Sequence, residues 1–265
     1  MKSTYLLSLI LICINSHVNA LIHEINTIKR MKHFVPHKNR SKTLIVIDID
    51  NTLIEAQLPQ ARPAYYKLLI KHYETMGIPH TIAQQQAVDY ILPFLKKTAV
   101  KPAENSTVKI IQQLQNKGYP VVALTARSPI IQETLQQLQS IGITFSLQNY
   151  IPDVQKKIVD ATLTRPAWYQ QGVIFCNNND KGKVLKKFLT MINFKPKKII
   201  TIDDQLYNVQ SVEKMAHNNR IPFIGLRYNF FDATYTQNYT FPAYDAPKTS
   251  DVTHFLKNQH TQPAH

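Results

Sequence analysis

The chain has 265 residues and is 44% hydrophobic, which suffices for one large core with an insertion, and its formal net charge is +14. Such a charge attracts phosphates, nucleic acid or an anionic membrane face, although solvated lysine faces are the simpler interpretation. Because no basic stripe is interleaved with aromatic residues, we expect no specific nucleic-acid binding. With only two cysteines, Cys13 and Cys176, a disulfide-rich fold is excluded.

Residues 1–20 have the pattern of a cleaved signal peptide. Lys2 precedes an apolar run from Tyr5 to Ile14, and small residues at Val18-Asn19-Ala20 suit cleavage. The run is shorter than the roughly 20 apolar residues of a membrane span. We therefore expect an exported protein, periplasmic or secreted, with no transmembrane span after cleavage; an uncleaved anchor is the alternative. Cleavage would leave Cys176 alone, in an apolar run that predicts a buried strand and an inert core thiol.

From residue 43 onward, short apolar segments alternate with amphipathic ones. This alternation predicts an α/β fold in three layers, with a Rossmann-like, mainly parallel sheet covered by helices on both faces. We expect a core over 43–230, a partly helical lead-in at 21–42 and a polar tail at 231–265. The expected strands are Thr43–Ile49, Pro120–Leu124, Thr144–Leu147, Val173–Cys176, Lys198–Ile202 and Pro222–Leu226. The expected helices are Thr107–Lys117, Pro129–Ser140, Gly182–Ile192 and Asn208–Asn218.

The segment at about 54–102 interrupts this alternation. It contains two helix-like pieces, Pro63–Met76 and Ile82–Leu92, separated by Gly77-Ile78-Pro79. Because the insertion follows the first strand of the core directly, we expect it to form a small helical cap over the carboxyl end of that strand. A second irregular stretch, Gln148–Gln171, is harder to assign.

Two carboxylates stand directly after the first apolar run of the core. Side chains alternate along a strand, so Asp48 and Asp50 are expected to point to the same side. Two anions held so close together need a cation or a shared proton. The pair therefore predicts a metal site in which one carboxylate attacks a substrate and the other handles protons.

Further polar groups stand where other strands end, which is where ligands bind in open α/β sheets. The second strand runs into Thr125, with Arg127 just beyond it, and a later strand runs into Asp203-Asp204. Lys181 stands near the start of a predicted helix. Phosphoryl transfer needs a nucleophile in line, cations against the phosphoryl oxygens and a proton for the leaving oxygen. Aspartate can be that nucleophile, and Mg²⁺ prefers oxygen ligands.

In this order the segments resemble the four motifs of the haloacid dehalogenase superfamily, whose members are mostly phosphohydrolases. The matching residues are Asp48-Ile49-Asp50-Asn51-Thr52, Thr125, Lys181 and Asp203-Asp204. The resemblance covers roughly residues 43–226 and extends to a bacterial family of exported superfamily members without an assigned substrate. It implies a capped core of this superfamily and a Mg²⁺-dependent phosphohydrolase that forms an aspartyl-phosphate.

By this resemblance Asp48 is the nucleophile and Asp50 the general acid, then the base for water. Thr125 and Lys181 hold the phosphoryl group, and we expect Arg127 to contact the substrate. The metal ligands implied are Asp48, the backbone carbonyl of Asp50, Asp203, and Asp204 directly or through water. A carboxylate at Asp50 favours phosphatase chemistry, on a phosphorylated small molecule or a phosphorylated surface.

Each assignment has a simpler alternative. Asp50 could cap a turn, Thr125 could satisfy a helix start, Lys183 could replace Lys181, Arg127 could form a surface ion pair, and Asp203-Asp204 could be a solvated turn. We expect Asn208 to brace the acidic loop, and His72 and His80 to be surface or packing residues. At the level of function, the alternatives are a phosphotransferase and a non-catalytic protein that binds anionic partners on the same scaffold.

Overall fold

A computed structural model describes residues 21–145, 147 and 155–235, so the predicted signal peptide and most of the predicted tail lie outside the described residues. An eight-stranded sheet in the order β1-β10-β9-β2-β5-β8-β7-β6 forms its centre. The first six strands in this order run parallel, and β7 and β6 join antiparallel. The strands are β1 (Leu21–Ile25), β2 (Thr43–Ile47), β5 (Val121–Thr125), β6 (Lys156–Ile158), β7 (Ala167–Gln170), β8 (Val173–Phe175), β9 (Lys198–Asp203) and β10 (Phe223–Tyr228).

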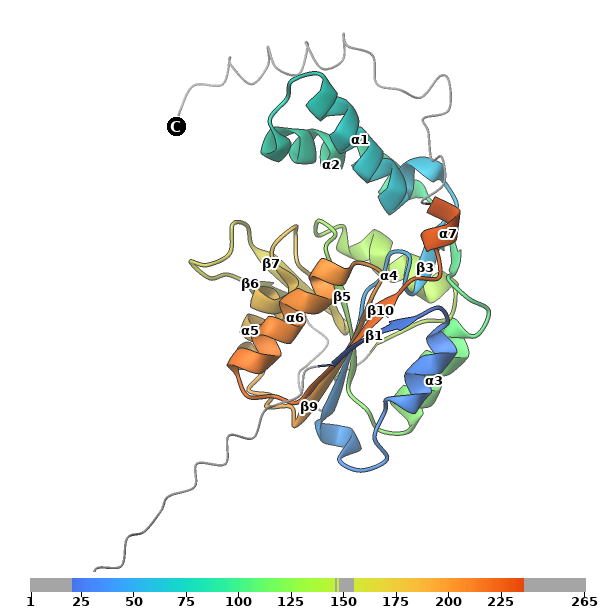
Figure 1. Cartoon of the computed structure of the whole chain (residues 1–265), viewed down its shortest axis with the longest axis vertical. Coiled ribbons are helices and arrows are strands. Elements are labelled where there is room, and N and C mark those ends of the chain that lie inside the picture. Colours follow the sequence, from blue (N-terminus) through green and yellow to red (C-terminus); the bar gives the residue numbers. More distant parts are fainter. Residues whose placement is uncertain (1–20, 146, 148–154, 236–265) are drawn as a thin grey trace, which may run out of the picture.

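Helices cover both faces of this sheet (Figure 1). The helices are α3 (Thr107–Asn116) and α4 (Ile131–Ser140) on one face, and α5 (Lys181–Met191) and α6 (Leu206–Asn218) on the other. Strand β2 contributes to both cores, because Ile45 and Ile47 pack with the first pair of helices and Leu44 and Val46 with the second. Every residue of β2 and of β5 is buried, as expected for central parallel strands. The predicted fold class is therefore confirmed.

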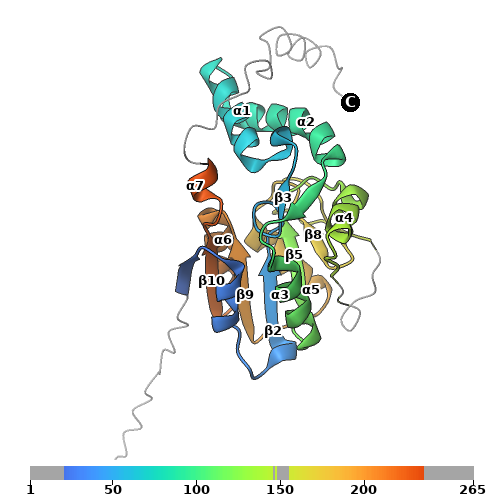
Figure 2. The same ribbon diagram turned by 90° about the vertical axis from the view of Figure 1, so that its right-hand side faces the viewer.

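The insertion forms a small helical cap over the carboxyl ends of the parallel strands (Figure 2). Two antiparallel strands, β3 (Ile54–Ala56) and β4 (Val100–Pro102), connect the cap to the core. The helices α1 (Pro63–Thr75) and α2 (His80–Lys97) lie between these strands in the sequence. The two helices bury a core cluster of their own, which includes Leu69 of α1 and Ala87 of α2. Helix α2 continues through Pro93 to Lys97, past its predicted end at Leu92.

One prediction is corrected by the structure. The predicted strand Thr144–Leu147 is wrong, because its described residues are not in a strand and β7 occupies the position beside β8. The two-residue turn between β7 and β8 places Gln171 at φ 46° and Gly172 at φ 74°, the signs of a type I′ hairpin turn. The lead-in, predicted to be partly helical, also contains a strand that was not predicted, because Leu21–Ile25 pairs in parallel with β10 at the sheet edge. Short 3₁₀ helices at Ile28–His33, Arg40–Lys42 and Pro59–Ala61 and the C-terminal α7 (Asp232–Tyr235) complete the described elements.

Candidate active site

Three buried side chains from three elements meet at the carboxyl end of β2. The ammonium group of Lys181 donates to Oδ1 of Asp48 at 2.5 Å and to Oδ2 of Asp203 at 2.7 Å. Asp48 follows β2, Lys181 begins α5 and Asp203 ends β9, and none of these side chains is more than 8% exposed. The structure therefore brings the predicted nucleophile, the predicted lysine and the first acid of the doublet into one ion-paired group.

The start of α5 determines which lysine reaches this group. Asp180 caps the helix, because its carboxylate accepts a hydrogen bond from the backbone N–H of Lys183 at 2.8 Å. Gly182 lets α5 approach α6 closely, since a Cβ at this position would lie 2.2 Å from the carbonyl oxygen of Ser211. Lys183 itself is exposed. Of the two candidate lysines, Lys181 is the one that contacts Asp48.

Polar groups of its own loop and of the cap hold the acidic doublet. Oδ1 of Asp203 accepts hydrogen bonds from the side-chain amide of Asn208 at 3.0 Å and from the backbone N–H of Gln205 at 2.9 Å. The side chain of Gln205 donates to Asp204 at 2.5 Å and accepts from the ammonium group of Lys67 on α1 at 2.7 Å. Asn208 thus braces the loop, and Gln205 links the doublet to the cap.

The group has more negative than positive charge, as a cation site requires. Asp48, Asp203 and Asp204 each offer a carboxylate oxygen within 4.8 Å of the others, against the single ammonium group of Lys181. Burial raises the pKa of Asp48 well above its usual value; Lys181 opposes this rise, and the other carboxylates add to it. Burial and the neighbouring Asp203 raise the pKa of Asp204 to about 7. Oxygen-only ligands and the excess negative charge both fit Mg²⁺.

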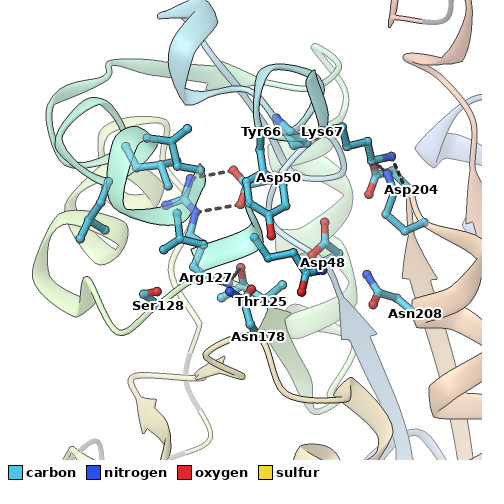
Figure 3. A pocket seen from close by; sticks show the side chains of 18 of the residues that line it. Asp48, Asp50, Tyr66, Lys67, Thr125, Arg127, Ser128, Asn178, Asp204 and Asn208 are labelled. Carbon is cyan, nitrogen blue, oxygen red and sulfur yellow. Dashed lines mark hydrogen bonds and ion pairs between the residues drawn. The ribbon is translucent and has the colours of Figure 1, made fainter. Parts of the chain in front are cut away.

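Asp50 is held by a different partner. Arg127 binds both of its carboxylate oxygens, with Nε donating to Oδ2 and Nη2 to Oδ1, each at 2.8 Å (Figure 3). The side chain of Arg127 is 3% exposed, so the alternative of a surface ion pair is wrong. Bidentate pairs of this kind fix orientation as well as charge. The carboxylate of Asp50 is therefore oriented by Arg127 and not by the Lys181 group.

Arg127 in turn is tied to the end of the cap. Its Nη1 donates to Gln137 at 2.7 Å and to Thr134 at 3.0 Å, both on α4. The amide of Gln137 donates to the carbonyl oxygens of Leu95 at 2.7 Å and Thr98 at 3.1 Å, where α2 ends. Two buried side chains therefore connect the Asp50 carboxylate to the cap.

A cavity of about 320 Å³ lies between the cap and the core. Its polar lining includes Asp48, Asp50, Thr125, Asp204 and Asn208 (Figure 3). The hydroxyl oxygen of Thr125 accepts a hydrogen bond from the backbone N–H of Arg127 at 3.2 Å, which leaves the hydroxyl proton for donation. Lys181 and Asp203 do not line the cavity. Both are 2% exposed, and in this structure Lys181 contacts the two carboxylates of Asp48 and Asp203.

All the predicted site residues thus gather at one end of the sheet, whereas His80 pairs with Glu74 on the outside of the cap and His72 does not line the cavity. Three connecting residues were not singled out from the sequence: Lys67, Gln137 and Gln205. Gln137 had a signal that could have revealed it. It lies on the buried face of α4, where an amphipathic helix normally carries apolar residues. Lys67 and Gln205 carry no comparable signal, because both are partly or fully exposed polar residues.

The fold and the site together define a class: a capped, Rossmann-like α/β protein with a lysine-paired acidic site at the carboxyl ends of its parallel strands. The chain belongs to the DUF2608 family, described as a protein of unknown function, which it matches over residues 22–260. None of the helices in the described part of the chain is long and apolar enough to cross a membrane.

The chain is also similar to several bacterial proteins. "Putative outer membrane protein" of Chlamydia trachomatis is 25% identical over 86% of this chain and 84% of the relative, and a protein of the same name from Chlamydia pneumoniae is 25% identical over 69% and 68%. An uncharacterised protein of Rickettsia prowazekii is 22% identical over 70% and 69%. Among solved structures, a haloacid dehalogenase-like hydrolase of Streptococcus pneumoniae aligns with a TM-score of 0.38 and 13% identity, over 74% of this chain and 99% of that one.

Proposed function

We propose that this chain is an exported, Mg²⁺-dependent phosphohydrolase that cleaves phosphomonoesters through an aspartyl-phosphate at Asp48. One observation carries the proposal. The Asp48 carboxylate is bound by Lys181 at the base of a cavity, beside the acidic pair Asp203 and Asp204 and two residues before Asp50. Carboxylates buried in this way are costly unless something uses them.

Each of these groups has a role in the reaction. Lys181 binds Oδ1 of Asp48, so the other carboxylate oxygen is the one that attacks phosphorus. As the new O–P bond forms, the bond to the leaving oxygen breaks, and Asp50, which enters this step protonated, donates its proton to that oxygen. Asp50 then takes a proton from water, whose oxygen attacks phosphorus, releases inorganic phosphate and restores Asp48.

Two further groups complete the phosphate site. The hydroxyl group of Thr125, at the end of β5, donates to a phosphoryl oxygen. Asp48, Asp203 and Asp204 would hold Mg²⁺, which when bound supplies positive charge against the phosphoryl oxygens. The substrate class proposed is a phosphorylated small molecule.

The proposed location outside the cytoplasm has two supports. Residues 1–20 have the composition of a signal peptide. Three relatives from Chlamydia species carry names that refer to the outer membrane. A phosphomonoesterase in the periplasm or outside the cell would act on phosphate esters that cross or arise in that compartment.

The variant Asp48→Asn tests the proposal. With Mg²⁺ and an aryl phosphate, turnover is expected to fall by at least about 10³-fold, because the nucleophile is lost. The matched control is Asp89→Asn, which changes an exposed carboxylate on α2 away from the cavity. Circular dichroism checks that both variants fold. Full activity of Asp48→Asn would eliminate the proposed nucleophile.

A further inference from the structure

The two ends of the cavity differ in chemistry. The carboxylates lie at the core end, whereas α2 lines the cap end mainly with apolar side chains, with Gln84 as its polar contribution to the lining. Val88, Ile91, Leu92 and Leu95 recur at the spacing of one helical face, and Ile130 adjoins them from the core. A leaving group bound to a phosphoryl group at Asp48 would extend from the polar end toward this apolar wall.

Val88 is the most informative residue of the wall. It is half-buried, yet it belongs to none of the hydrophobic core clusters in the described part of the chain, the cap's own cluster included. Its exposed apolar surface faces the cavity, where a ligand would remove it from water. Covering such surface stabilises a complex by roughly 25 cal/mol per Å².

The wall opposite α2 offers few cationic groups that would recognise a multiply charged leaving group. Its cap residues are Pro63, Tyr66 and Lys67 of α1, with Tyr207 at the rim. The ammonium group of Lys67 already donates to Gln205, and the other cationic side chain of the lining, Arg127, already binds Asp50. Sugar hydroxyl groups placed against the apolar part of the α2 wall, from Val88 to Leu95, would lose their hydrogen bonds to water without replacement, at about 1–3 kcal/mol each.

The volume limits the size of the leaving group. About 320 Å³ has to hold the phosphoryl group as well, and it lies near the lower end of the roughly 300–1,000 Å³ of small-molecule sites. We propose that the substrate is a phosphomonoester with a compact apolar leaving group, of the size of one ring or one branched chain, recognised by the Val88 face of α2. This proposal rests on the proposed phosphohydrolase function and names its substrate class.

The test compares two esters that differ in polarity and little else. Cyclohexylmethyl phosphate and glucose 6-phosphate both have a primary alkoxide leaving group next to a six-membered ring, so their chemical reactivity is similar. We expect kcat/KM to be at least about 10-fold higher for the cyclohexylmethyl ester. Val88→Gln should reduce this ratio at least about 5-fold. The control is Ile82→Gln, on the same helix but 43% exposed and outside the cavity lining, which should leave the ratio unchanged.

A second readout does not depend on turnover. Calorimetry with the wild-type protein, Mg²⁺ and the uncleavable cyclohexylmethylphosphonate should show binding that Val88→Gln weakens and Ile82→Gln does not. Val88→Thr, which keeps the side-chain shape, replaces Val88→Gln if the latter fails to fold. Equal kcat/KM values, a preference for glucose 6-phosphate, or phosphonate binding that is insensitive to residue 88 would overturn the apolar specificity. Absence of turnover with every phosphoester would instead count against the phosphohydrolase, and the phosphonate arm would then decide the specificity by itself.

Discussion

Asp48 and Asp50 stand two positions apart in the chain, but different groups bind them. We call the group of Asp48, Lys181 and Asp203 the core side of the site, and the group of Asp50, Arg127 and Gln137 the cap side. Asp48 is bound by Lys181, which belongs to α5 and also binds Asp203 at the end of β9. Asp50 is bound by Arg127, whose partner Gln137 reaches the end of the cap helix α2. The position of the proposed nucleophile, Asp48, is therefore set by packed core elements. The position of the proposed proton donor, Asp50, also depends on where the cap lies relative to the core.

This difference has a consequence for catalysis. The ion pairs around Asp48 are buried and join elements that pack tightly, so they are expected to persist whether or not a substrate is bound. The contacts of the cap with the core near the site include the bonds of Gln137 and the bridge from Lys67 to Gln205. A movement of the cap would therefore change the surroundings of Asp50 before those of Asp48.

The largest expected effect concerns the core side. Lys181→Met removes the ammonium group from among three buried carboxylates, which should lower the free energy of unfolding by about 3–5 kcal/mol in metal-free protein. The measurement is denaturant unfolding in the presence of a chelator. Lys183→Met is the control, because that lysine is exposed. Equal stability of the two variants would show that the Lys181 group does not hold the core side together.

The next effect concerns the cap side. Gln137→Met keeps the size of the side chain but leaves Arg127 and two carbonyl groups at the end of α2 without their partner. We expect kcat to fall about 10-fold, and the free energy of unfolding to fall by about 1–3 kcal/mol. The affinity for Mg²⁺, measured by calorimetry, should stay unchanged because the acidic group is not touched.

Gln136→Met provides the matched control, since the neighbouring Gln136 is exposed on the same helix. An equal loss of Mg²⁺ affinity and of kcat in Gln137→Met would contradict the separation of the two sides. Wild-type kcat in that variant would show that Asp50 needs no support from the cap.

A smaller effect is expected from Asp204→Asn. Removing one negative charge from the buried acidic group should raise the stability of the metal-free protein by about 1 kcal/mol at pH 8, where the Asp204 carboxyl is largely charged because its pKa is about 7. The same variant should lose most of the rise in Tm that Mg²⁺ causes in the wild type. Thermal melts with Mg²⁺ and with chelator measure both changes, with Asp89→Asn as the control. A Mg²⁺-induced rise that survives in Asp204→Asn would exclude Asp204 from the metal ligands.

The smallest expected effect concerns the reactivity of the Cys176 thiol. Cys176 is fully buried directly after β8, and burial raises the pKa of its thiol to about 12. In a chain that begins at Leu21 it is the single cysteine. Its reaction with a disulfide reagent should therefore be slow in native protein and fast in denaturant. Rapid labelling of the native protein would contradict this expectation, because it would show that the core around Cys176 opens locally. Local opening is expected of the cap and not of the core.

Much of the site could be predicted because it follows from topology. Asp48, Thr125 and Asp203 stand where parallel strands end, and the carboxyl ends of adjacent parallel strands meet at one edge of a sheet. The choice of Lys181 rested on the resemblance, because Lys181-Gly182 at the start of a helix matches the third motif of the superfamily. Proximity of these groups requires no knowledge of side-chain packing.

The remaining features depend on packing between distant segments. The bond from Gln137 to the end of α2 joins residues about forty positions apart, one on the core helix α4 and the others in the cap, and no local pattern encodes it. The hairpin of β7 and β8 was missed for another reason. Gln171 adopts the positive φ of a type I′ turn without being asparagine, aspartate or glycine, the residues that usually indicate it.

The most direct test of the account is to locate the covalent intermediate. The wild-type protein is mixed with Mg²⁺ and an aryl phosphate, quenched in acid during turnover, digested and analysed by mass spectrometry. The account predicts a phosphoryl group on Asp48, in the peptide that also contains Asp50, and no adduct in Asp48→Asn. A phosphoryl group on another residue, or sustained turnover by Asp48→Asn, would contradict it.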